Sequence, residues 1–304
     1  MRVWVAVLAA TVRCHSLGVD ADRGLRTLDT PLLSVLELYG TYAASAYQRF
    51  EDWTSCDACQ VPTIRNTHIV ATWSTLVPAF SRGYVGIHHT YKQIVVVFRG
   101  STHIMDALTD AQIVQIAWPS NTESKVHAGF VAAYTAAQSH VLQALHTIDK
   151  DRDLDTYSLH FIGHSLGAAQ ATLAYIDFCL SHAHRDAQLV TYGAPRIGNP
   201  QFALLLGSLS EHTPHTEQEN ALRVVHECDI VAHLPRSMLL LGEYEHGGHE
   251  IWARDADTDH KAQDLIICQH THEDSKCSSS TSMLRWTILD HFVYPGMRLG
   301  IPRY

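Results

Sequence analysis

A serine flanked by glycines is the residue of this sequence best suited to nucleophilic chemistry. Gly163, Ser165 and Gly167 form the pattern Gly-x-Ser-x-Gly. Attack on an ester carbonyl needs an exposed hydroxyl close to backbone N–H groups, which bind the developing oxyanion. A sharp turn from a strand to a helix meets these needs, and the two glycines lack the Cβ atoms that would collide in it. The pattern therefore predicts Ser165 as a catalytic nucleophile.

The residues on both sides of Ser165 fit such a turn. Residues 159–162 read Leu-His-Phe-Ile, which is typical of a buried strand, and residues 168–174 are rich in alanine, which indicates a closely packed helix. The five-residue pattern alone arises by chance in roughly one chain in ten of this length, given ordinary usage of Gly and Ser. A strand before the pattern and a helix after it make a chance match much rarer.

Strand-like apolar runs alternate with helical patterns along the chain. Several runs are β-branched and nearly continuous, as in strands that are buried on both faces. The alternation predicts an α/β fold in which helices cover a mainly parallel central sheet, with polar surface loops between elements. The expected strands are 69–73, 93–98, 158–162, 188–192, 222–225 and 250–252, the expected helices are 31–47, 129–148 and 168–180, and the expected loops are 208–220 and 269–282.

The N-terminus has the features of a secretory signal peptide. Met1 and Arg2 form a positive start, and residues 3–12 are mostly apolar but too few to cross a bilayer, which takes about 20 residues. We expect a signal peptide over residues 1–19 and one domain over residues 20–304, because no repeat or long linker divides the rest. The protein would then be secreted and extracellular, with no transmembrane segment.

The charge balance argues against a nucleic-acid partner. The chain has 22 Lys and Arg against 31 Asp and Glu, which gives a formal net charge of −9. Its basic residues form no cluster that could outweigh this negative field.

Seven cysteines in an exported chain suggest disulfides. We expect Cys14 to leave with the signal peptide, Cys179 and Cys228 to be buried thiols, and the closely spaced cysteines to form local disulfides. A redox motif at residues 56–59 is an alternative, but no strand precedes it and no helix follows it. The expected local pairs are Cys56–Cys59 and Cys268–Cys277.

Four further segments, taken with the serine motif, resemble the fungal class 3 lipases typified by the secreted Rhizomucor and Thermomyces enzymes. The similarity runs in order from about residue 35 to residue 296. It implies an α/β-hydrolase fold with a short helical lid, and a mechanism that needs no cofactor. The segments are 96–101 (Val-Val-Phe-Arg-Gly-Ser), 126–130 (Val-His-Ala-Gly-Phe), 191–199 (Thr-Tyr-Gly-Ala-Pro-Arg-Ile-Gly-Asn) and 229–235 (Asp-Ile-Val-Ala-His-Leu-Pro).

The same resemblance supplies the other members of a Ser-Asp-His triad. Asp229 matches the family's aspartate, just past a predicted strand, and His291 matches its histidine. His291 would take the Ser165 proton and return it to the leaving alcohol, while Asp229 orients the imidazole and stabilises its cation. The matching oxyanion donors are Ser101, through hydroxyl and backbone, and Leu166, through its N–H. An N-cap role for Ser101 is compatible with this.

Residues 102–110 form a short amphipathic segment with Ile104, Met105 and Leu108 on one face. In the similar enzymes this segment is a lid, which opens at a lipid surface and uncovers the serine. An ordinary surface helix is the alternative. Ala107 stands where the triacylglycerol lipase used for comparison has Trp. This difference is compatible with a preference for mono- and diacylglycerols, as in a secreted subset of the family, and equally with general triacylglycerol activity.

Two histidine clusters could suggest a metal site. Residues 246–250 read His-Gly-Gly-His-Glu, which lacks the helical histidine pair of zinc peptidases and fits a turn into a strand. His270 and His272, with Glu273 and Asp274, fit a solvated loop. We therefore expect no bound metal and no cofactor.

The sequence thus predicts a secreted lipase that hydrolyses mono-, di- or triacylglycerol esters through an acyl-enzyme at a lipid–water interface. We expect it to be a monomer. One alternative is a feruloyl or other carbohydrate-ester esterase with the same fold and triad. A second, non-enzymatic alternative is a secreted lipid-binding protein, against which the complete set Ser165, Asp229 and His291 argues.

Overall fold

The structure is a computed structural model, in which ten segments of the chain are described. The predicted signal peptide and the lid residues Ile104, Met105 and Leu108 lie outside them. The described residues are 26–27, 30–77, 79–101, 114–120, 122–182, 186–210, 220–236, 242–254, 264–268 and 273–299.

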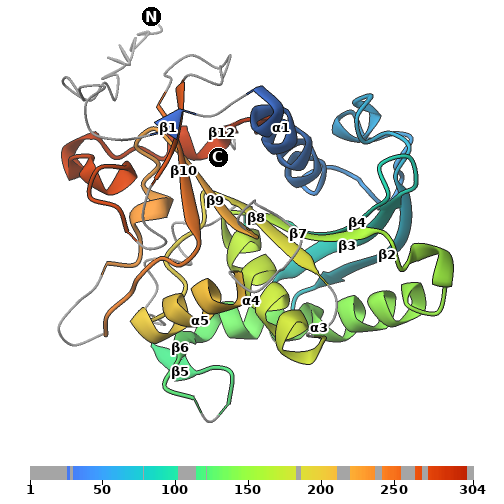
Figure 1. The fold of residues 1–304 in the computed structure, drawn as a ribbon, viewed down its shortest axis with the longest axis horizontal. Coiled ribbons are helices and arrows are strands. Elements are labelled where there is room, and N and C mark those ends of the chain that lie inside the picture. The colour runs from blue at the N-terminus through green and yellow to red at the C-terminus, as the bar shows by residue number, and fades with distance from the viewer. Residues whose placement is uncertain are drawn as a thin grey trace, which may run out of the picture.

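A twisted nine-stranded sheet forms the centre of the described part of the chain, in the order β1-β11-β10-β9-β8-β7-β4-β3-β2 (Figure 1). Its five middle strands, from β10 to β4, pair in parallel, while both edges are antiparallel. This confirms the predicted α/β-hydrolase architecture. The strands are β1 (Arg26–Thr27), β2 (His68–Thr75), β3 (Ser81–His88), β4 (Gln93–Phe98), β7 (Ser158–His164), β8 (Ala187–Tyr192), β9 (Ala221–His226), β10 (His249–Ala253) and β11 (Leu265–Ile267).

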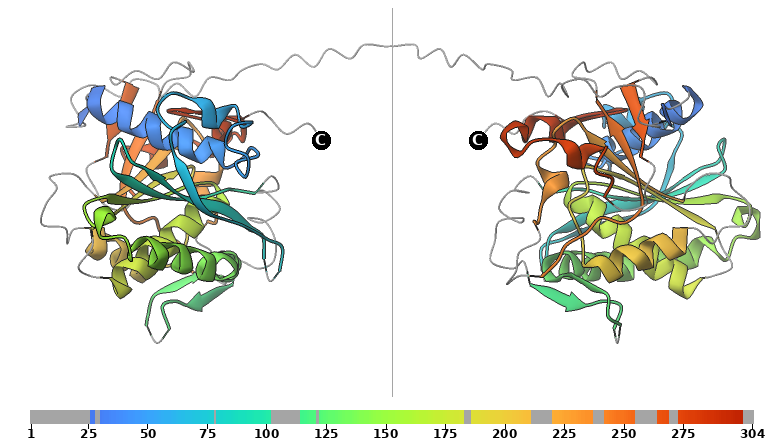
Figure 2. Two further views of the ribbon diagram at one scale, coloured as in Figure 1. Left: turned by 90° about the vertical axis from the view of Figure 1, so that its right-hand side faces the viewer. Right: turned by 60° about the vertical axis from the view of Figure 1, so that its left-hand side comes forward.

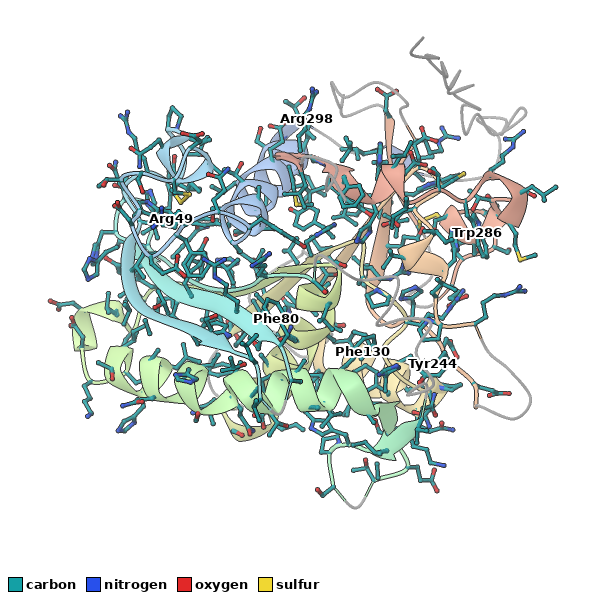
Figure 3. All side chains as sticks on the ribbon, turned by 180° about the vertical axis from the view of Figure 1, so that it is seen from behind. Arg49, Phe80, Phe130, Tyr244, Trp286 and Arg298 are labelled. Atoms are coloured by element: carbon teal, nitrogen blue, oxygen red, sulfur yellow. A yellow bond between two sulfur atoms is a disulfide. The ribbon has the colours of Figure 1, made fainter. Side chains whose placement is uncertain are left out.

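Helices cover both faces of this sheet (Figures 1 and 2). The helices α3 (Ala128–Ile148), α4 (Leu166–Ser181) and α5 (Pro200–Ser210) lie on one face, and α1 (Thr30–Ser45) lies on the other. Strand β4 shows why both faces need cover, because its successive apolar side chains alternate between the two cores. Phe130, at the start of α3, lies in the larger core (Figure 3).

Two small hairpins and several single turns complete the described fold. The turn η7 and the hairpin β12–β13 end the described chain beside α1 and the middle of the sheet. The hairpin strands are β5 (Gln115–Ala117), β6 (Lys125–His127), β12 (Val293–Tyr294) and β13 (Met297–Arg298), and the turns are η1 (Ala58–Gln60), η2 (Arg152–Leu154), η3 (Val231–His233), η5 (Ser278–Ser280), η6 (Met283–Arg285) and η7 (Leu289–Phe292). No helix in the described ranges has the length and apolar character that a bilayer crossing requires.

The cysteines follow the sequence prediction with one exception. The structure contains the disulfides Cys56–Cys59 and Cys268–Cys277, and Cys179 is a half-buried thiol. Cys228, expected to be a buried thiol, is disulfide-bonded instead, so that expectation is wrong. The reason is a long-range pairing, which the spacing of cysteines in the sequence does not reveal. Because the other described cysteines are accounted for, the partner of Cys228 lies outside the described residues.

Candidate active site

Ser165 occupies the sharp turn between β7 and α4. Its backbone has φ 62° and ψ −130°, a conformation that costs a non-glycine residue about 1–3 kcal/mol and that persists only where the surroundings enforce it. The flanking glycines permit the turn. A Cβ on Gly163 would lie 2.2 Å from the Gly167 carbonyl oxygen, and one on Gly167 would lie 2.3 Å from that of Phe98. The side chain at the tip is thereby held at the carboxyl ends of the parallel strands.

Asp229 and His291 form a buried pair. The carboxylate follows β9, the imidazole belongs to η7, and His291 Nδ1 donates to Asp229 Oδ2 over 2.7 Å. The Tyr294 hydroxyl donates to the same oxygen, and the backbone N–H of Val231 donates to Oδ1 over 2.8 Å. With three donors and no exposure to solvent, the carboxylate is fixed in position.

The pKa of Asp229 reflects two opposing effects. Burial raises the pKa, while the charge and hydrogen bond of His291, together with the Tyr294 and Val231 donors, lower it. The donors prevail, and the pKa lies below its ordinary value. Burial also raises the pKa of Tyr294 well above its ordinary value, so its hydroxyl keeps the proton that it donates.

Two buried polar atoms of the site have no hydrogen-bond partner within the described segments. They are Ser165 Oγ and His291 Nε2. His164, the residue before the serine, joins the two parts of the site, because its ring centroid lies 4.4 Å from that of His291. The fold thus brings Ser165, Asp229 and His291 together from three separate parts of the chain.

His164 contacts the backbone of His291, which the sequence reasoning missed. His164 Nε2 lies 2.8 Å from the His291 carbonyl oxygen, which can only accept, so Nε2 carries the proton. Its Nδ1 then accepts from the Tyr47 hydroxyl over 2.7 Å. Burial, reinforced by the neighbouring His291 ring, keeps the pKa of His164 well below its ordinary value. The neutral His164 imidazole therefore links Tyr47 to the backbone of His291.

Comparison with known proteins identifies the family. The family model for class 3 lipases matches residues 95–238. A lipase of Rhizomucor miehei is 30% identical over 292 residues, covering 93% of this chain and 74% of that protein. The chain belongs to the class 3 lipase family. The resemblance drawn from the sequence is thereby confirmed.

Two further relatives agree with this membership. A secreted mono- and diacylglycerol lipase A of Penicillium cyclopium is 28% identical over 237 residues, covering 75% of this chain and 72% of that protein. A solved triacylglycerol lipase whose catalytic centre is a serine protease triad matches with a TM-score of 0.78 and 29% identity, covering 91% of this chain and 99% of that chain. This class 3 lipase is accordingly a carboxylic ester hydrolase.

The expected oxyanion donors of the lipase flank Ser165 on two elements. Leu166 is the first residue of α4, where backbone N–H groups have no partner within the helix. Ser101 follows β4, and the intervening Gly100 lies against the nucleophile, since a Cβ on it would be 2.8 Å from Ser165 Cβ. Both donors therefore belong to segments that contact the serine turn.

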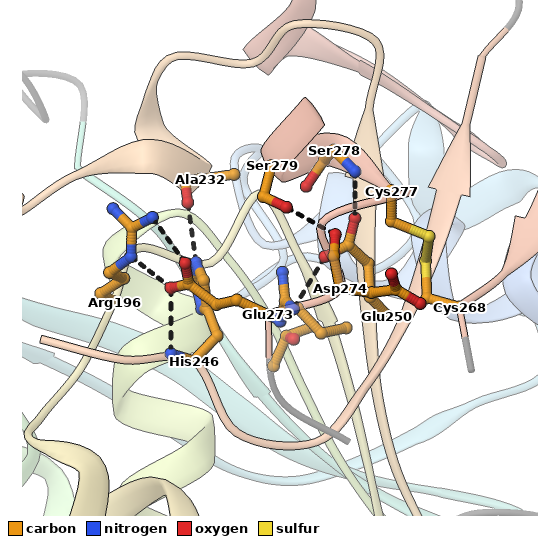
Figure 4. Close-up of polar contacts among 12 residues, drawn as sticks. Arg196, Ala232, His246, Glu250, Cys268, Glu273, Asp274, Cys277, Ser278 and Ser279 are labelled. Atoms are coloured by element: carbon orange, nitrogen blue, oxygen red, sulfur yellow. Dashed lines mark hydrogen bonds and ion pairs between the residues drawn. A yellow bond between two sulfur atoms is a disulfide. The ribbon is translucent and has the colours of Figure 1, made fainter. Parts of the chain in front are cut away.

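A polar network fixes the loop that follows Asp229 in this lipase (Figure 4). Arg196 donates to the carbonyl oxygens of His233 and Pro235, the latter over 3.2 Å. The same guanidinium pairs with both carboxylate oxygens of Glu273, at 2.5 and 3.0 Å. His246 Nε2 lies 2.7 Å from the Ala232 carbonyl oxygen. Three carbonyls of the loop are thus held by side chains from other segments, and sequence periodicity carries no signal for this.

One group of potential metal ligands occurs among the described residues, and its donors are already engaged. It comprises Glu250, Cys268 and Cys277. The two sulfurs form a disulfide, and Glu250 pairs with buried Arg223 at 2.9 Å and accepts from the Ser278 N–H. These residues therefore do not form a free donor set. The predicted turn into a strand is present, since β10 begins at His249.

Proposed function

We propose that this lipase hydrolyses acylglycerol esters with Ser165 as nucleophile, His291 as general base and Asp229 as the residue that orients the base. One observation carries the proposal. Ser165 Oγ and His291 Nε2 are buried without partners in the described part of the chain, while Asp229 holds the opposite ring nitrogen at 2.7 Å. A base with a free nitrogen and a nucleophile with a free oxygen, placed in one buried site, are arranged for proton transfer.

The residues would act in two half-reactions. Ser165 Oγ attacks the ester carbonyl while His291 Nε2 takes its proton, and the oxyanion is bound by Ser101 and the Leu166 N–H. The tetrahedral intermediate collapses as His291 protonates the leaving alcohol, which leaves an acyl-enzyme. Water, deprotonated by the same nitrogen, then releases the fatty acid and restores the serine. Asp229 stabilises the imidazolium in both halves.

A lipid–water interface is the proposed site of action. Met283, Leu284 and Leu289 are 54, 96 and 52% exposed, and all belong to turns just before or within η7, which carries His291. Large apolar side chains in water favour contact with a lipid surface. Residues 102–110 would be the lid, with Ile104, Met105 and Leu108 meeting the lipid. That proposal rests on the sequence.

We propose that the protein is exported from the cell and that it is a monomer. The local disulfides Cys56–Cys59 and Cys268–Cys277 suit an oxidising compartment. We place a signal peptide at the N-terminus, nominally residues 1–19, and one catalytic domain over residues 20–304. The relative named as a secreted mono- and diacylglycerol lipase supports export and places partial glycerides among the substrates to test.

Hydrolysis of monoolein, diolein, triolein and methyl ferulate tests the proposal. Ser165→Ala should lower glyceride hydrolysis by several orders of magnitude, and Asp229→Asn by about 10⁴-fold. Ser181→Ala, an exposed serine at the end of α4, is the matched control and should keep wild-type activity. A fully active Ser165→Ala protein would overturn the mechanism. Dominant turnover of methyl ferulate would overturn the substrate class.

A further inference from the structure

A cavity of about 460 Å³ lies outside the triad, between α1, η1 and the hairpin β12–β13. Its volume is within the range of about 300–1,000 Å³ that is typical of small-molecule sites. The proposed mechanism does not use it.

Two arginines line this cavity. Arg99 directly follows β4, and its Nε is buried with no hydrogen-bond partner in the described ranges. The Arg99 guanidinium lies 5.5 Å from the Tyr47 ring centroid and 5.6 Å from that of Phe80, contacts that do not neutralise its charge. Arg298 lines the cavity from β13, beside α1 (Figure 3). The Arg99 guanidinium nitrogen without a partner in the described ranges favours an anion in this partly enclosed space.

The rest of the lining divides into apolar and polar parts. Ala44, Ala58, Val61 and Leu299 supply aliphatic contacts. The carboxamide of Gln48 also lines the cavity, but its Oε1 accepts from the Ala58 N–H over 3.1 Å. A ligand with an anionic head and an aliphatic chain complements this combination of arginines and small apolar residues.

We propose that the cavity binds a single-chain anionic amphiphile, with its carboxylate or phosphate on Arg99 and its alkyl chain against Val61 and Leu299. A free fatty acid and an alkyl phosphate share this chemistry. The binding itself does not depend on the proposed ester hydrolysis.

The cavity also adjoins the nucleophile turn. Tyr47 lines it and hydrogen-bonds His164 Nδ1 over 2.7 Å. Gly100, the residue after Arg99, lies between the cavity wall and the serine, because a Cβ on it would be 2.2 Å from the Tyr47 hydroxyl and 2.8 Å from Ser165 Cβ. A ligand held by Arg99 would therefore contact the segment that carries Ser101. This effect on catalysis, unlike the binding, rests on the proposed function.

Calorimetric titration of Ser165→Ala protein tests the proposal, since that variant cannot turn over an ester. The probes are decanoate, decyl phosphate and uncharged decanol, each below its critical micelle concentration. We expect saturable binding of an anion and at least tenfold weaker binding of decanol. Arg99→Gln, which removes the cation, and Val61→Trp, which fills the cavity, should each weaken anion binding at least tenfold. Arg65→Gln, at an exposed arginine outside the cavity, is the matched control and should leave the affinity unchanged.

Three results would overturn the proposal. They are the absence of saturable anion binding, equal affinity for decanol and decanoate, and anion binding that both cavity variants leave intact in folded protein. The last result would place the amphiphile elsewhere, such as the catalytic cleft. The ratio of decanoate to decyl phosphate affinity identifies which anion the site prefers. Because binding is measured without turnover, its failure is distinct from a failure of the proposed hydrolysis.

Discussion

His164 Nε2 donates a hydrogen bond to the backbone carbonyl oxygen of His291, 2.8 Å away and 127 residues later in the chain. The residue before the proposed nucleophile therefore supports the residue proposed as its base. Tyr47 completes the chain by donating to His164 Nδ1. Loss of either hydrogen bond should shift the His291 imidazole, although neither loss removes a group that takes part in the reaction.

Replacement of His164 by phenylalanine tests this support. His164→Phe keeps an aromatic ring but leaves the His291 carbonyl and the Tyr47 hydroxyl unpaired, at about 1–3 kcal/mol for each buried group. We expect kcat to fall about tenfold or more, and Tyr47→Phe, which removes only the outer bond, to have a smaller effect. Steady-state kinetics and urea unfolding of the three proteins measure both effects. A folded His164→Phe enzyme with wild-type kcat would contradict the role of His164.

Tyr294 should hold Asp229 in its ionised form. Tyr294→Phe removes one donor from Asp229 Oδ2, so the lowered pKa of that carboxyl should rise. A hydrogen bond to a charged group contributes about 1.5–3 kcal/mol and one pKa unit is about 1.4 kcal/mol, so the rise should be about one unit. The ionised carboxylate stabilises the fold above its ordinary pKa of 3.8, and the variant should lose part of that contribution.

Unfolding of Tyr294→Phe and wild-type protein at a series of pH values measures this loss. The difference in free energy of unfolding should be largest above pH 3.8 and shrink as the pH falls below it. Tyr91→Phe, at a tyrosine that is 48% exposed, is the matched control and should keep the wild-type stability at each pH. If Tyr294→Phe and the wild type differ by the same amount at every pH, the Tyr294 hydroxyl does not support the ionised form of Asp229.

The sequence predicts the middle of the fold well because local composition determines it. Residues 93–98 are almost entirely β-branched or aromatic, and β4 has these bounds. Strand β3 was missed because its sequence, Ser-Arg-Gly-Tyr-Val-Gly-Ile-His, contains two glycines and two polar residues at its start. Gly83 is needed there, since a Cβ on it would lie 2.4 Å from the Trp73 ring. The expected loop 208–220 begins inside α5, which continues to Ser210.

The site, like the fold, has a part that local sequence predicts and a part that it does not. Ser165 carries a local motif, and family resemblance located Asp229 and His291. The supports of these residues come from distant segments, such as the Tyr294 hydroxyl, 65 residues beyond the aspartate that it contacts. Such contacts exist only after the sheet has formed, and one sequence contains no record of them. Among 22 histidines, no local sequence feature shows that His164 contacts the His291 carbonyl or that His246 contacts the Ala232 carbonyl.

Glu273 should stabilise the fold in a pH-dependent way through Arg196. Burial raises the pKa of Glu273, but the hydrogen bonds from Arg196 and the nearby positive groups outweigh burial and bring the pKa to about 2. Because this pKa is lowered, the contribution of ionised Glu273 to the free energy of unfolding is complete above the ordinary value of 4.5 and is lost as pH falls toward 2. After a discount for the 28% exposure of the carboxylate, we expect about 2 kcal/mol near neutral pH.

Unfolding of Glu273→Gln and wild-type protein at pH 7 and at a series of lower pH values measures this contribution. The difference in free energy of unfolding should be largest at pH 7 and shrink as pH falls below 4.5. Glu51→Gln, which removes the exposed partner of Arg82, is the matched control and should cost much less. A difference independent of pH would mean that the ionised carboxylate is not the stabilising form.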